Sequence, residues 1–124
     1  MNATEPTTIG LSDRVHGYLT QMKEDNHIAE MLDGYRLGVA FALSQGIVDP
    51  PEVKTPKKTV FSIASVDPDH EVALAISAII DLDGQSVYRM AERLAEWGIN
   101  TIHERFDGGH LDVAALIKQT QGAA

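Results

Sequence analysis

Apolar residues between positions 26 and 46 recur at the spacing of a helix face, and this stretch is the most regular in the chain. One stripe consists of Ile28, Met31, Leu32, Tyr35, Val39, Ala42 and Leu43. A second set, Leu37, Ala40 and Phe41, lies away from that stripe, which is typical of a helix buried on several sides. We expect Asn26 to cap this helix and Gly46 to end it in a left-handed conformation. Either the C-terminal half of the chain or a second copy must then cover the helix.

The residues before this helix predict a short strand followed by a shorter helix. Ile9 and Leu11 alternate with polar or small residues, as in a half-buried strand. Ser12 is a good N-cap, and Asp13 complements the dipole of a helix that begins there. The apolar face of that helix consists of Val15, Tyr18, Leu19 and Met22. A turn over residues 23–26 then leads into the central helix.

Prolines interrupt the helical pattern over residues 49–66 and predict an extended connector. Within the connector, the alternation around Phe61 and Ile63 predicts a second short strand, or a clip packed against the helices. Asp67 and Pro68 then signal the start of another helix. Because that helix is almost wholly apolar, we expect it to lie in the core.

The last part of the chain predicts three more helices. The first spans residues 86–97 and is ended by Gly98 at its C′ position, and the second spans residues 99–106. In the first, the side expected to face solvent carries Arg89, Glu92, Arg93 and Glu96. The third is indicated by the apolar residues Leu111, Val113, Leu116 and Ile117.

Together these elements predict a mainly α fold: a compact helical domain with a short N-terminal strand and a possible second short strand. We expect one domain over residues 7–118, with disordered ends at residues 1–6 and 119–124. Its three parts are a strand-helix-helix unit over residues 7–48, a connector rich in proline and lysine over residues 49–66, and part of a helical bundle over residues 67–118.

Composition and charge narrow the classes of function. The chain has 124 residues, of which 44% are hydrophobic, so it can bury a core without disulfides. The absence of cysteine, of a signal peptide and of a long apolar run predicts a soluble cytoplasmic protein without membrane contact. The net charge of −8 disfavours direct DNA binding, because that affinity comes mainly from neutralised phosphates. An acidic protein of this size binds basic partner proteins, or is acidic only for solubility.

No motif identifies a reaction, so we expect a non-enzymatic protein without a cofactor or a metal. No serine lies in a Gly-x-Ser-x-Gly setting, and the chain has neither a phosphate-binding glycine loop nor a dinucleotide fingerprint. His103 and His110 are separated by a Gly-Gly turn, and are not the i, i+4 pair that one helix presents to zinc.

The order strand, helix, turn, helix resembles the ribbon-helix-helix fold, in which two chains pair their N-terminal strands and the ribbon enters the DNA major groove. We expect an oligomer interface formed by Ile9 and Leu11 of this strand and by Leu37 and Phe41, because the central helix is apolar on more than one side. The residues that would contact nucleic acid are Thr8, Gly10, Arg14, Lys54, Lys57 and Lys58. The strand lacks the Arg, Lys, Asn or Gln that usually read bases. The alternatives are a strand used only for dimerisation and a solvated lysine loop.

Two further segments resemble the small helical proteins that accompany bacterial DNA phosphorothioation (Dnd) systems. The first is LSDRVHGYLTQMK followed by DGYRLGVAFALSQG, which resembles a segment of the form DxxRxxxAxALxxG after a short N-terminal strand. The second is AERLAEWGINTIHERFDGG, which is similar to the closing segment of one Dnd-associated family. The resemblance implies an accessory role in DNA modification or phage defence. The lysine-rich surface of the DNA-binding member of such systems is missing here.

We therefore expect a non-enzymatic accessory or regulatory protein of a bacterial DNA-modification or phage-defence system. It would form a homo-oligomer and act through a protein partner, with DNA as a further partner that the net charge disfavours. The alternative is an acidic inhibitor or DNA mimic that occupies a basic groove of a nucleic-acid enzyme. A small enzyme is the third hypothesis, and the lack of any catalytic motif disfavours it.

Overall fold

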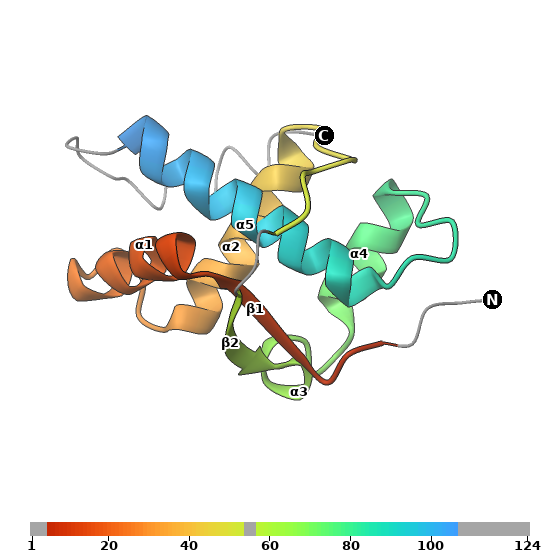
Figure 1. Cartoon of the computed structure of the whole chain (residues 1–124), viewed down its shortest axis with the longest axis horizontal. Coiled ribbons are helices and arrows are strands. Elements are labelled where there is room, and N and C mark those ends of the chain that lie inside the picture. Colours follow the sequence, from red (N-terminus) through yellow and green to blue (C-terminus); the bar gives the residue numbers. More distant parts are fainter. Residues whose placement is uncertain (1–4, 54–56, 107–124) are drawn as a thin grey trace.

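The computed structural model of the protein describes residues 5–53 and 57–106, which form one helical body with a small sheet (Figure 1). Its elements are β1 (Thr8–Ser12), α1 (Asp13–Glu24), α2 (Met31–Ser44), β2 (Lys57–Ser62), α3 (Ile63–Val66), α4 (Glu71–Ile79) and α5 (Val87–Phe106). The mainly α fold with two short strands is therefore confirmed. The predicted last helix, both predicted disordered ends except residues 5 and 6, and Lys54 lie outside the described residues.

Helices α2 and α5 cross at two glycines, and this crossing forms the centre of the fold (Figure 1). A Cβ atom built on Gly98 would lie 2.6 Å from the carbonyl carbon of Gly38 and 2.9 Å from its Cα. Gly98 therefore allows the two backbones to touch, and it does not end a helix. The predicted break at this position is wrong, because α5 continues through it to Phe106.

The two ends of α2 were predicted with different success. The helix begins at Met31, not at Asn26, which has a φ of 61° in the turn that closes α1. The end is as predicted: Gly46 has a φ of 75°. Its N–H donates to the carbonyl of Leu43, and the next N–H donates to the carbonyl of Ala42. These two bonds form the Schellman motif that satisfies the last carbonyls of a helix.

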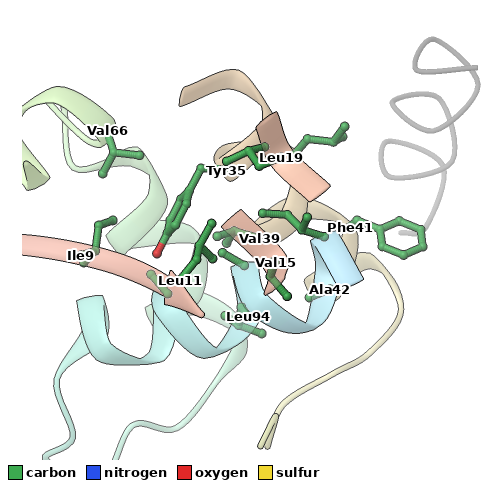
Figure 2. Packing of buried hydrophobic residues seen from close by; sticks show 14 of the residues in the cluster. Ile9, Leu11, Val15, Leu19, Tyr35, Val39, Phe41, Ala42, Val66 and Leu94 are labelled. Atoms are coloured by element: carbon green, nitrogen blue, oxygen red, sulfur yellow. The ribbon is translucent and has the colours of Figure 1, made fainter. Parts of the chain in front are cut away.

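Most apolar residues of α2 are covered within a single chain, whereas Ala40, of the second predicted set, is exposed. Leu37 is 9% exposed and Phe41 is fully buried, so both sides of the helix face the core. The aromatic ring of Phe41 stacks on Trp97 of α5. In Figure 2 the ring of Tyr35 extends toward β1, and it meets the ring of Phe61 edge to face at 5.4 Å.

The two strands pair with each other. β1 runs antiparallel to β2, with Thr8 opposite Ser62 and Ser12 opposite Lys57, and the register shifts by a bulge after Ile9. The alternation around Phe61 thus does mark a strand, as predicted. The chain therefore completes its own two-stranded ribbon, whereas a ribbon-helix-helix protein needs a strand from a second chain.

Helix α4 is not the core helix that its composition predicts. Its buried residues are Ile76 and, just past its end, Ile80. Leu74 is 67% exposed and Ile79 is 53% exposed. The reason is the crossing of α2 and α5, which already fills the centre and leaves α4 to pack from the outside with one side only. Figure 1 shows α4 at the edge of the molecule, far from α1.

Candidate interaction surfaces

Helix α5 covers the edge of β1 that β2 leaves open. The N–H of Gly10 donates to Oε2 of Glu92 at 2.8 Å, and the N–H of Ser12 donates to Oε1 of Glu96 at 3.0 Å. Two residues of a strand span about 6.7 Å and four residues of a helix about 6 Å, so glutamates at i and i+4 match alternate strand amides. The two carboxylates thus occupy the donors that a further strand would use.

Glu92 is buried, and its predicted place on a solvated side is wrong. Its side chain is 3% exposed because β1 lies over this side of α5. Besides the N–H of Gly10, it accepts a hydrogen bond from Nη1 of Arg89 at 2.8 Å. A buried carboxylate needs such partners, since losing the hydration of a charge is costly. The hydrogen bond from Gly10 therefore joins α5 to the sheet, and the ion pair with Arg89 lies within α5 itself.

The predicted oligomer residues lie inside the single chain. Ile9 and Leu11 face the core, as expected, and are fully buried together with Phe41, while Leu37 is nearly so. No part of this set is free to meet a second copy. An oligomer would therefore have to form through other surfaces.

Of the predicted nucleic-acid contacts, three are exposed in the structure and one is buried. Thr8, Arg14 and Lys58 are exposed, but Gly10 is buried with its N–H bound to α5, so its expected outward position is wrong. Lys57 lies in β2, and its side chain, like all of Lys54, falls outside the described part of the chain.

Two of the three exposed residues, Arg14 and Lys58, are cations, and these two lie at the same end of β1. Thr8 lies at the other end of this strand. The guanidinium of Arg14 donates to Oδ1 of Asn100 at 2.7 Å. Burial and the charge of Lys58 lower the pKa of His16. This lowered pKa disfavours His16 as an additional cation beside Lys58.

A buried aspartate fixes the start of α4 to α5. Asp67 accepts hydrogen bonds from the N–H groups of Val72 and Ala73, at 2.9 and 3.1 Å, and from the hydroxyl of Tyr88 at 2.8 Å. The predicted N-cap is wrong, because α4 begins at Glu71 and its N-cap is His70, with a φ of 60°. Asp67 instead bonds the first turn of the helix from three residues before that cap. Burial and the bond to Asp67 raise the pKa of Tyr88 to about 12.

The outer side of α4 carries an apolar surface, which we call the α4 face. It consists of Leu74, Ala75, Ala78 and Ile79, all exposed. These positions are one and four residues apart, so they share one side of the helix, opposite the buried Ile76. Large apolar side chains exposed together on one surface are typical of contact sites.

Carboxylates lie at both ends of the α4 face. Asp69 and Glu71 precede it, Asp81 and Asp83 follow it, and all four side chains are exposed. The sequence contains neither Lys nor Arg between positions 67 and 85. The cation beside the first pair is Arg36, which donates to the backbone carbonyl of Val66 at 2.9 Å and lies 3.7 Å from Asp33.

Charged side chains line a hollow of about 290 Å³ beside Trp97. Of its two carboxylates, Glu96 accepts a hydrogen bond from Ser12 and Glu52 is exposed, and the guanidinium of Arg14 donates to Asn100. The residues that the structure describes contain no group of three or more His, Asp or Glu placed to hold a metal. Within the same ranges, no helix combines the length and the apolar character that crossing a bilayer requires.

Sequence reasoning missed the carboxylates that organise the structure. A signal for Glu92 exists, because it lies on the helical row of Tyr88, Ala95 and Ile99, which are all buried. The exposure of α4 has no such local signal, since its pattern fits a buried helix equally well.

Comparison with protein-family models, with curated proteins and with solved structures finds no match to this chain.

Proposed function

We propose that this protein is a non-enzymatic accessory protein that works by binding another protein through the α4 face. The observation that carries the proposal is the exposure of two large apolar side chains, Leu74 and Ile79, on a helix whose other side is anchored to the core. Such a surface costs free energy in water unless a partner covers it.

The sequence resemblance to Dnd accessory proteins supports a bacterial DNA-modification or defence complex as the setting of that partner. Direct DNA binding has less support, because Gly10 is buried and the net charge of the chain is −8. Of the expected contacts whose side chains the structure describes, the two cations are Arg14 and Lys58, and affinity for DNA grows with the number of phosphates neutralised.

Site-specific photo-crosslinking in the native host tests the proposal. A photoreactive amino acid at position 74 should give one discrete adduct with another protein, and the same group at Gln21, which is exposed on α1, should not give it. The protein identified in the adduct, once purified, should bind the parent chain and lose that binding to the double variant Leu74→Ser, Ile79→Ser.

Two results would contradict the proposal. The first is the same adducts, or none, from positions 74 and 21. The second is partner binding that the serine variant leaves unchanged and that moderate salt abolishes. That second result would favour the acidic inhibitor or DNA mimic, because such a protein binds through its carboxylates alone.

A further inference from the structure

We infer that the occupant of the α4 face is an amphipathic helix of the partner protein with basic residues at both of its ends. This inference rests on the proposed function and specifies the chemistry of the partner. It follows from three properties of the surface: the absence of free backbone groups, the sizes of its side chains and the charges around it.

A helix offers side chains to a partner and keeps its backbone groups bonded internally. The α4 face is therefore unsuited to pairing with an extended strand, which binds through main-chain hydrogen bonds. Sheet extension is also blocked at β1, whose outer edge is bound by Glu92 and Glu96. Recognition at the α4 face must then rest on packed apolar side chains, as when an amphipathic helix lies in a groove.

The side chains of the face have the size pattern that a crossing helix needs. Ala75 and Ala78 lie in the middle, with Leu74 on one flank and Ile79 on the other. Small central residues let another helix approach closely, because the distance between packed helices depends on the side chains at the contact. The larger flanking side chains would then cover the sides of the incoming helix.

The charges at the ends of the face select a basic occupant. Asp69 and Glu71 lie at one end and Asp81 and Asp83 at the other, all exposed, so lysines or arginines at both ends of an incoming helix would meet carboxylates. Opposite charges placed in this way raise the association rate and exclude partners of the wrong sign.

The same charges argue against two occupants from this protein itself. In a second copy, parallel or antiparallel pairing of α4 places carboxylates against carboxylates, which disfavours association. The stretch over residues 107–124 has apolar residues but more Asp than Lys or Arg, so it offers no charge complement either.

Binding of designed peptides to the full-length protein tests the inference. The probe is a labelled amphipathic helical peptide with leucines on one side and three lysines at each end. The matched peptide carries glutamates in place of those lysines. We expect the lysine peptide to bind in fluorescence anisotropy and the glutamate peptide to bind at least about tenfold more weakly, since like charges are excluded at the ends.

Two double variants separate the apolar and the charged contributions. Asp81→Lys with Asp83→Lys should weaken binding of the lysine peptide by roughly tenfold. Leu74→Ser with Ile79→Ser should weaken the same binding by roughly tenfold or more. The control is the double variant Glu24→Lys with Glu30→Lys. It makes the same change of charge on exposed residues elsewhere and should have no comparable effect on binding of the lysine peptide.

Five results would overturn the inference. The first four are equal binding of the two peptides, equal weakening by the control variant, binding that the serine variant leaves unchanged, and self-association of the parent protein that the serine variant abolishes. Binding that appears only after residues 107–124 are removed would also overturn it, because the chain itself would then be the occupant. If crosslinking from position 74 succeeds while the lysine peptide fails to bind, the proposed function stands and only this inference falls.

Discussion

Replacing Gly98 with alanine tests whether α2 and α5 touch through their backbones. The new Cβ would lie 2.6 Å from the carbonyl carbon of Gly38, whereas ordinary contacts of this kind begin at 3.4 Å. The carbonyl oxygen of Gly38 lies closer still, so the helices must separate by more than the roughly 0.8 Å that the contact with the carbonyl carbon alone requires. Neither backbone can yield by a side-chain rotation, because both contacting groups belong to the main chain.

The expected loss follows from that separation. A radial gap of roughly 0.5–1 Å forfeits about a quarter to a half of the dispersion energy of each contact it opens. Overpacked cores lose about 1–3 kcal/mol, and we place Gly98→Ala near the top of that range. The higher helix propensity of alanine returns about 1 kcal/mol. The net change in the free energy of unfolding should be a loss of about 2 kcal/mol, which lowers Tm by about 6–10 °C.

Gly17 provides the matched control. It also lies inside a helix, α1, but a Cβ there would have no atom within 4 Å outside its immediate surroundings. Gly17→Ala should therefore raise the free energy of unfolding by about 0.5–1 kcal/mol, through backbone entropy alone. Urea unfolding followed by circular dichroism measures both. If the two variants shift stability in the same direction, the glycine crossing is refuted.

Substitutions at four further positions test the core and the buried polar groups. Phe41→Ala should cost about 3–5 kcal/mol on thermal unfolding, and a loss near zero would show that the ring is not buried. Glu92→Ala should cost about 1–3 kcal/mol by stranding the N–H of Gly10, and Glu92→Gln should cost less because an amide oxygen still accepts; equal losses would contradict the bond. Tyr35→Phe should raise stability by about 1 kcal/mol, since the buried hydroxyl has no hydrogen-bond partner among the described residues; a clear loss would reveal one. The pKa of Tyr88 rises from 10.0 to about 12 on folding, so its contribution to stability is present below pH 10 and is lost as the pH rises toward 12. Tyr88→Phe should remove that loss of stability from unfolding curves measured between pH 9 and 12. An unchanged pH dependence would contradict the raised pKa.

Features governed by near neighbours in sequence were predictable. Ser12 caps α1 by accepting a hydrogen bond from the N–H of Val15, and Gly46 ends α2, because each role depends on a few adjacent residues. The inward direction of Ile9 and Leu11 was predictable as well, since it follows from the alternation of a strand. These local rules led to the correct fold class.

Features governed by distant contacts were not predictable. Gly98 has the local pattern of a helix stop, and only the approach of Gly38, far away in sequence, shows that it is a crossing point. The charge of Glu92 indicates a solvated residue although its helical row is otherwise apolar, and only the position of β1 shows that it is buried. Sequence periodicity shows that a residue can be buried. Whether the residue is buried depends on which helices occupy the core.

The competition of the helices for the core also explains which carboxylates the fold uses internally and which remain on the surface. Several carboxylates are used internally: Glu92 and Glu96 bind β1, and Asp67 binds the start of α4. Their positions follow from the need of exposed strand and helix amides for acceptors. The carboxylates beside the α4 face have no comparable task in holding the core, and Asp81 accepts the N–H of Asp83 within its own turn. The exposed residues of the α4 face lie outside the core, to which the same helix contributes Ile76. A surface that combines exposed apolar residues with such carboxylates contributes little to the stability of the isolated chain. Binding of a partner therefore explains the composition of the α4 face better than a role in the fold does.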